Sequence, residues 1–220
     1  MRITRDNSPE ANEDLLYWIR QGEHKQQDFK FAINNSKKIA ITLSAFANSE
    51  GGRLLIGVKD NGKIAGVHAE DELHMLEGAA ELYCRPTVQL QVTVIETEEG
   101  KDVVSVWVDR TTDEFIQAQN PEGEWRAYLR EGDENFIASP LHLEWWKREK
   151  KKPLRDPSTF GEDEKGLLVL LGTQAEWRLN ALVRASGKPR RAVIHRLADF
   201  LYWGLAELVR VDNEYRLRSK

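Results

Sequence analysis

Up to residue 146, segments in which apolar residues recur every three to four positions alternate with segments in which they recur every second position. The first spacing predicts helices that bury one face, and the second predicts half-buried strands. Helices are expected at 12–21, 36–49, 69–83 and from 139 through 146, and strands at 26–31, 53–58, 63–67, 87–96, 103–109 and 125–130. This mixture indicates an α+β fold with a mixed or antiparallel sheet.

From residue 162 onward the pattern changes to three helices followed by a β-hairpin. The helices are expected at 162–171, at 176–185 and from Pro189 to Gly204, and two short strands within 205–218 surround Asp212 and Asn213. Proline suits the first turn of a helix, and glycine suits the position just after its end. Three helices followed by a hairpin is the layout of a small winged helix-turn-helix domain.

Residues 147–161 separate these two patterns. Basic residues, two prolines, Ser and Gly replace the apolar periodicity there, which is typical of a linker. We therefore expect a first domain at 1–146, a linker at 147–161 and a second domain at 162–220.

The net charge of −4 is divided unevenly along the chain. Residues 1–140 hold 15 Lys and Arg against 25 Asp and Glu, a net charge of −10, whereas residues 141–220 hold 17 against 11, a net charge of +6. A cationic module at one end of a chain favours an anionic partner such as nucleic acid.

Composition excludes several other classes of protein. With 40% apolar and 31% charged residues, the chain is not intrinsically disordered. The single cysteine, Cys84, excludes an intramolecular disulfide and fits a reducing compartment. No stretch approaches the roughly 18 apolar residues that cross a bilayer, and the N-terminus has no apolar signal core. We expect a cytoplasmic protein with no membrane partner.

The predicted strand 26–31 alternates aromatic and charged residues. Phe29 and Phe31 should point to one face of the strand, and Asp28 and Lys30 to the other. The aromatic side chains would then anchor the strand and leave an acid and a base exposed side by side. An ordinary surface ion pair is the alternative interpretation of Asp28 and Lys30.

Glu23, Asp28 and Asp60 are carboxylates at the ends of short predicted elements. If they converge, their oxygen atoms suit Mg²⁺ or Mn²⁺, and such an ion can activate water for phosphodiester cleavage. They are candidate catalytic and metal-binding residues. The alternative is that Asp60 only shapes the turn before Asn61 and Gly62, since aspartate favours the start of a turn.

The residues around these acids resemble the Schlafen-type AlbA domain. Four residues separate Glu23 from Asp28, which Phe29 and Lys30 follow, and the most specific part is the run Ala-Phe-Ala-Asn-Ser-Glu-Gly-Gly-Arg-Leu-Leu-Ile-Gly-Val at 45–58. The similarity extends over about residues 10–140 and implies an α+β domain that binds nucleic acid, widespread in bacteria and often joined to a winged helix. In nucleolytic members of the wider family, three acids act on RNA with a divalent metal. They would correspond to Glu23, Asp28 and Asp60, although the family usually has Glu at the second position and Asp28 is one methylene shorter.

In a winged helix the third helix enters the major groove and the hairpin contacts the DNA backbone. Arg190, Arg191 and Arg196 should be available to solvent on that helix. The full set of candidate nucleic-acid contacts is Lys30, Lys188, Arg190, Arg191, Arg196, Arg210, Arg216 and Arg218. A protein-docking module is the alternative for this layout, but the concentration of basic residues favours nucleic acid. Two-fold operators favour a homodimer, although no coiled-coil seam supports one.

Residues 57–63 match the first seven positions of a P-loop, but Ile64 stands where Ser or Thr must contact Mg²⁺. Three functions follow from the sequence. The first is a DNA-binding regulator of transcription, with RNA as the other possible nucleic acid. The second is a divalent-metal-dependent ribonuclease that uses the three carboxylates. The third is a nucleotide-responsive scaffold.

Overall fold

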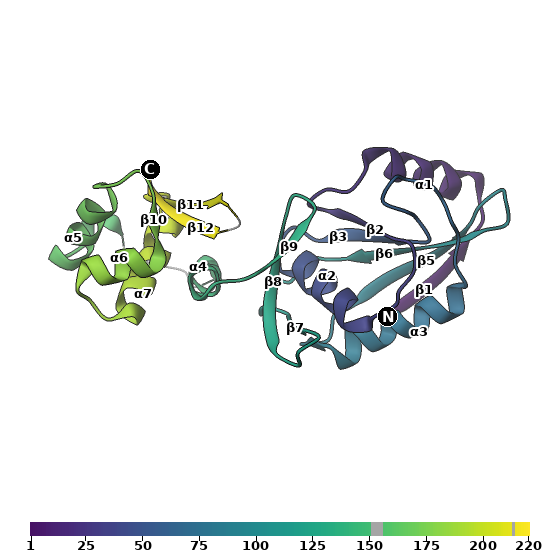
Figure 1. Cartoon of the computed structure of the whole chain (residues 1–220), viewed down its shortest axis with the longest axis horizontal. Helices are drawn as coiled ribbons and strands as arrows, with labels where there is room; N and C mark the ends of the chain where they lie inside the picture. Colours follow the sequence, from purple (N-terminus) through teal and green to yellow (C-terminus); the bar gives the residue numbers. More distant parts are fainter. Residues whose placement is uncertain (151–155, 213) are drawn as a thin grey trace. The chain divides into compact units, whose positions relative to one another are not determined.

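The computed structural model describes residues 1–150, 156–212 and 214–220, which form two compact units, Met1–Ile137 and Ala138–Lys220 (Figure 1). Residues 151–155 of the expected linker and Asn213 of the expected hairpin lie outside the described residues. The first unit ends before residue 146, where the first domain was expected to end. The reason is that helix α4 (Pro140–Lys150) packs against the helices of the second unit.

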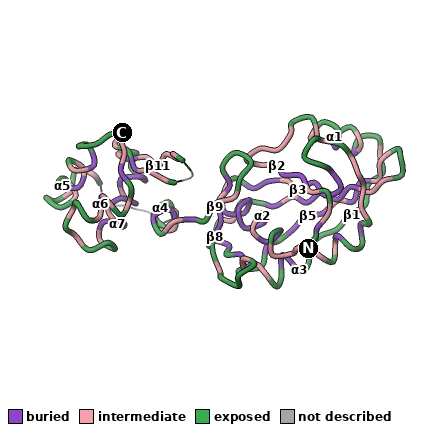
Figure 2. The backbone as a smooth tube through the Cα atoms, in the orientation of Figure 1, coloured by how far each residue is buried: buried purple, intermediate pink, exposed green. Residues whose placement is uncertain are grey.

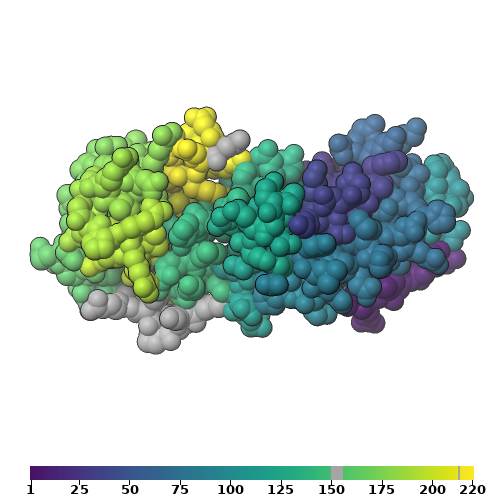
Figure 3. Space-filling view, turned by 60° about the horizontal axis from the view of Figure 1, so that its bottom comes forward, coloured from purple at the N-terminus to yellow at the C-terminus, as the bar shows by residue number. Residues whose placement is uncertain are grey.

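A five-stranded mixed sheet forms the centre of the first unit. Its strand order is β1-β5-β6-β3-β2, with β1 at Arg2–Asp6, β2 at Gln27–Lys30, β3 at Gly52–Ile56, β5 at Leu90–Glu96 and β6 at Asp102–Val108. β1 runs parallel to β5 and β2 parallel to β3, whereas β6 is antiparallel to both of its neighbours. Sequence periodicity missed β1 because all five of its residues are exposed. Figure 3 shows atoms from the N-terminal part of the chain, in purple, at the surface. The expected strand at 63–67 forms only isolated pairs.

Helices cover both faces of this sheet (Figure 1). α1 (Pro9–Gln21) packs on one face, where Leu15 meets Phe29 and Leu55. α2 (Ser36–Asn48) and α3 (Ala69–Leu82) pack on the other face, where Leu54 and Ile56 point. Because side chains alternate along β3, this strand contributes apolar residues to the hydrophobic cluster on each face of the sheet.

A second, four-stranded sheet covers α2 on the side away from the large sheet. Its order is β4-β7-β8-β9, with β4 at Cys84–Arg85, β7 at Gln117–Gln119, β8 at Trp125–Glu131 and β9 at Glu134–Ile137. α2 is consequently buried along most of its length (Figure 2). Asn48 at its end donates from Nδ2 to the carbonyls of Ile116 and Tyr128, at 2.8 and 2.9 Å, and its Oδ1 accepts from Ile116 N at 2.8 Å. A buried amide thus satisfies backbone groups beside the small sheet that would otherwise lack partners.

The glycine pair that follows α2 is required by close contacts. Gly51 has a φ of +75°, and a Cβ there would lie 2.8 Å from the carbonyl oxygen of Val108. A Cβ on Gly52 would lie 2.4 Å from Cδ1 of Phe46. Only glycine lets the chain turn out of the helix and enter β3 against the Phe46 ring.

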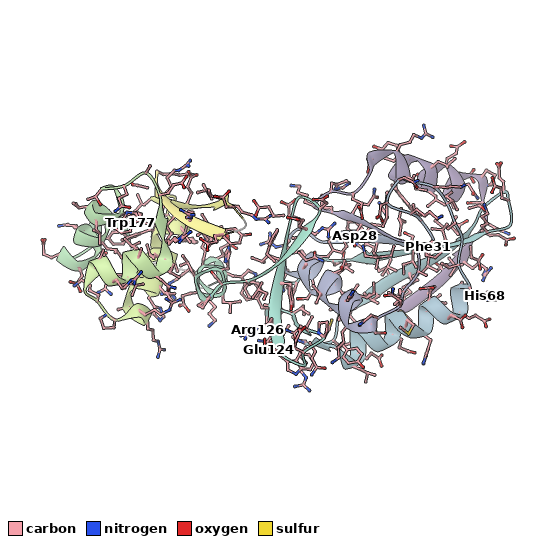
Figure 4. All side chains as sticks on the ribbon, viewed as in Figure 1. Asp28, Phe31, His68, Glu124, Arg126 and Trp177 are labelled. Atoms are coloured by element: carbon pink, nitrogen blue, oxygen red, sulfur yellow. The ribbon has the colours of Figure 1, made fainter. Side chains whose placement is uncertain are left out.

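The second unit contains α4, a short 3₁₀ turn, three helices and a three-stranded antiparallel sheet of order β10-β12-β11. The elements are η1 (Pro157–Thr159), α5 (Glu162–Leu171), β10 (Trp177–Arg178), α6 (Leu179–Ser186), α7 (Arg190–Tyr202), β11 (Ala206–Val211) and β12 (Glu214–Ser219). α6 begins later than expected because Trp177 and Arg178 pair with β12. Trp177 lies in the core of this unit (Figure 4). None of the described helices has the length and apolar character that spanning a lipid bilayer requires.

Candidate functional site

A tight turn before β2 brings two of the predicted carboxylates together. The backbones of His24 and Gln27 exchange two hydrogen bonds of 3.0 Å, so the chain reverses between Glu23 and Asp28. Glu23 Oε1 accepts a 2.9 Å hydrogen bond from the backbone N–H of Phe29, and its carboxyl group lies within hydrogen-bonding reach of Asp28. The sequence spacing of the two acids is therefore the spacing of this turn.

Asp28 is buried, which corrects the expectation of an exposed acid beside an exposed base. Its Oδ1 accepts from Arg130 Nη2 at 3.1 Å, and its Oδ2 pairs with Lys30 Nζ at 2.7 Å. The Arg130 side chain, from β8, is only 1% exposed. β2 also ends at Lys30, so Phe31 is exposed rather than packed with Phe29. Both carboxylate oxygens of Asp28 are thus paired with cationic side chains, and the positive charge of Lys30 is compensated by Asp28.

Burial changes the protonation of the groups around this turn. It raises the pKa of Glu23 above the usual range, and the Asp28 carboxyl raises it further, while the hydrogen bond from Phe29 opposes the shift. Burial lowers the pKa of His24, and the positive charge of Arg130 adds to that effect. Both pKa shifts are toward the uncharged form of the group.

Asp60 lies in an exposed turn closed by hydrogen bonds from Gly62 N to Lys59 O, 2.7 Å, and from Lys59 N to Lys63 O, 3.0 Å. Among the described residues, no three His, Cys, Asp or Glu side chains gather closely enough to hold a metal ion. The structure brings Glu23 and Asp28 together but does not add Asp60 to them. The three-carboxylate site for Mg²⁺ or Mn²⁺ therefore does not fit this arrangement. The P-loop-like residues 57–63 form part of this turn, and no helix follows them before α3.

The predicted basic residues of the second unit fall into two groups. Lys188 pairs with Asp163 of α5, and Arg196 pairs with Asp163 at 2.8 Å and Glu164 at 3.3 Å. Arg196 is therefore directed at α5, which corrects the expectation that it faces solvent. Arg190 and Arg191, in the first turn of α7, are exposed.

The hairpin arginines are engaged by neighbouring acids. Arg218 pairs with Glu176 at 2.6 Å and lies 3.7 Å from Glu207, and Arg216 lies 3.7 Å from Glu214. Arg210, on β11, also has an interaction partner. The hairpin presents less uncompensated positive charge than its sequence indicates.

The comparisons with known proteins address the first unit. A family model described as Schlafen, AlbA_2 matches residues 23–139, which is more than half of the 220 residues. The chain belongs to the Schlafen, AlbA_2 family. None of the curated proteins matches it. One of seven similar solved chains is the DIP2311 protein from Corynebacterium diphtheriae, with 18% identity and a TM-score of 0.45 over 74% of this chain and 33% of that one. The chain thus spans about a third of the length of that protein.

Membership of the Schlafen, AlbA_2 family supports a general role in binding nucleic acid, and the matched residues end where the second unit begins. Sequence reasoning missed two residues that the structure makes important, Arg130 and Arg184. Arg130 lies in the predicted strand 125–130, but nothing local to that strand indicates its pairing with Asp28. Arg184, in the last turn of α6, is exposed and was not among the predicted basic residues.

Proposed function

We propose that this protein binds DNA and regulates transcription, with the second unit as its winged helix-turn-helix module. The observation that carries the proposal is the element order α5, β10, α6, α7, β11, β12 in the part of the chain that has a net charge of +6. Two helices joined by a short turn and followed by a hairpin form the arrangement of winged helix-turn-helix modules that bind DNA. Membership of the Schlafen, AlbA_2 family supports nucleic acid as the partner.

The test is fluorescence anisotropy with a labelled duplex DNA and a single-stranded RNA of the same sequence, between 50 and 300 mM salt. We expect tighter binding to the duplex and an affinity that falls steeply with salt, because phosphate contacts release counterions. The variant Arg190→Glu/Arg191→Glu should lose binding. A control variant with the same change in charge, Arg20→Glu/Lys165→Glu, alters two exposed residues outside this surface. Equal loss in both variants, or salt-independent binding, would contradict the proposal.

The geometry of the acid pair favours binding over metal-dependent cleavage of RNA, because Lys30 and Arg130 occupy both oxygens of Asp28. Incubation of a structured RNA with Mn²⁺ tests this choice directly. We expect no cleavage by either the wild type or Glu23→Ala. Cleavage by the wild type that Glu23→Ala abolishes would favour the ribonuclease instead.

A further inference from the structure

The outward face of α7, which a reading helix would present to DNA, is covered by α4 of the same unit. Arg148 of α4 donates from Nε to Asp199 Oδ1 at 2.6 Å, and its Nη2 lies 2.8 Å from His195 Nδ1. Glu144, one turn earlier, lies 2.9 Å from both Arg148 Nη1 and His195 Nδ1. A four-residue polar network therefore fastens α4 along α7.

Apolar contacts complete the cover. Leu141 of α4 is 1% exposed, and it belongs with Trp145 to the core that includes Ile194 and Ala198 of α7. Within α7, only the first two residues, Arg190 and Arg191, are exposed. A reading helix contacts base edges with its N-terminal residues, and α4 leaves α7 no free face beyond that end.

The charges on and around α7 lead to the same conclusion. Asp199, on the covered face, is paired with Arg148 of α4, so this face offers a phosphate chain no free positive charge. Lys188 and Arg196 are compensated by acids of α5. Among the described residues of this region, the side chains of Arg184 and Arg191 have no hydrogen bond or ion pair, and the Arg190 side chain is bonded only to the neutral amide of Asn180.

Arg184 and Arg190 lie together at the corner between α6 and α7, and Arg191 is the next residue of α7. Asn180 and Arg184 are four residues apart on α6 and so lie on one side of that helix. The bond from Arg190 to Asn180 places the Arg190 side chain beside them, and Arg184 and Arg190 line one groove of about 450 Å³ next to the hairpin. Glu214 lines the same groove but pairs with Arg178 at 2.9 Å, so the three guanidinium groups have no acid partner among the described residues.

We propose that this corner, formed by Arg184, Arg190 and Arg191, grips the phosphate backbone of duplex DNA without reading its base sequence. The inference rests on the DNA-binding function proposed above and names its mode. Arginine suits this role because its planar fork of donors matches phosphate oxygens. Regulation would then come from occupying or shaping DNA rather than from recognising an operator.

The experiment measures affinity for a random-sequence duplex as a function of salt in the full chain. Three phosphate contacts give a slope of log K against log salt of about −2.7, and each of Arg184→Gln, Arg190→Gln and Arg191→Gln should reduce its magnitude by about 0.9. Lys165→Gln removes one exposed charge elsewhere in the unit as a matched control. Glu124→Gln/Arg126→Gln removes an exposed ion pair of the first unit without changing the net charge. Both controls should keep the wild-type slope.

Enrichment of bound duplexes from a random library supplies the second measurement, and we expect no consensus sequence. A consensus, or wild-type slopes in all three arginine variants, would overturn the backbone-gripping mode while leaving DNA binding intact. Failure of the wild type to bind any duplex would overturn the DNA-binding function itself, and the proposed mode with it.

Discussion

Replacing Arg130 with methionine tests the assignment of Asp28 as a structural rather than a catalytic acid. The Arg130 guanidinium donates to Asp28 Oδ1 and to the carbonyl of Gln27, both at 3.1 Å, and to Asn135 Oδ1 at 3.1 Å. It therefore fastens the small sheet to the turn that precedes β2. Methionine keeps most of the side-chain volume and removes every one of these donors.

The expected loss follows from the burial of the pair. Removing one partner of a buried ion pair costs about 3–5 kcal/mol, because the other charge remains buried and uncompensated. Lys30 still neutralises Asp28 in part, at 2.7 Å from Oδ2, so we expect the lower end of this range, about 3 kcal/mol. With a denaturant dependence of about 2 kcal/mol per molar urea, the unfolding midpoint should fall by about 1.5 M.

Cys84 provides a reporter for the first unit alone, since it is the only cysteine and is buried in that unit's core. Pulsed thiol labelling across a urea series gives the midpoint for Arg130→Met. The matched control is Arg126→Met on the same strand, whose guanidinium is half exposed and lies 3.3 Å from exposed Glu124 (Figure 4). That variant should lose less than about 1 kcal/mol. Equal losses in the two variants, or a loss below 1 kcal/mol in Arg130→Met, would refute the reasoning.

Three further predictions concern single groups. Burial lowers the pKa of His142 from 6.5 to about 4. Between these pH values the unfolded chain binds a proton that the folded chain does not, so the second unit should lose about 3 kcal/mol of stability as pH falls through them. Hydrogen exchange of α5 and α7 at pH 7.5 and 4.5 should show this loss in the wild type and a smaller loss in His142→Gln. Burial raises the pKa of Cys84 to about 12, so its thiol should not react with DTNB in the native protein and should react fully in urea; rapid native reaction would show that the site is open. Gly52→Ala should lower the free energy of unfolding by about 1–3 kcal/mol by overpacking against Phe46, and Phe46→Leu in the same chain should recover part of the loss in urea unfolding.

The periodicity of the sequence predicted most elements because their faces differ in polarity. α2, α3, α5 and the strands β5 and β6 were found to within a few residues, since each buries a stripe or an alternating face. β1 escaped because no residue in it is buried. β7 and β9 were not predicted because they have only three and four residues, and neither shows a clear alternation of buried and exposed positions.

The candidate site was less predictable because its interactions join distant parts of the chain. The turn between Glu23 and Asp28 is local, and the sequence analysis named both acids as candidates for one site without predicting the turn that joins them. The residue that makes Asp28 part of a buried ion pair is Arg130, which lies 102 residues away in the sequence. Likewise, Arg196 is turned away from solvent by its ion pairs with Asp163 and Glu164 of α5. The helical pattern of α7 does not predict where these two acids lie. Periodicity predicts which face of an element is buried, but it does not predict which charge lies opposite.

Asn48 and Gly52, within the run of residues that carries the family resemblance, and Ser44, next to it, have structural roles. Asn48 holds backbone groups beside the small sheet, Gly52 makes room for Phe46, and Ser44 Oγ donates to the Ile116 carbonyl at 2.8 Å. Each of these contacts attaches α2 to a sheet, and none points a free polar group at solvent. The motif therefore accounts for how the two sheets enclose α2, and it would persist in a member that had lost any catalytic site. Function in this chain has to be argued from charged groups at its surface, and in the second unit three arginines with no acid partner among the described residues lie at the corner between α6 and α7.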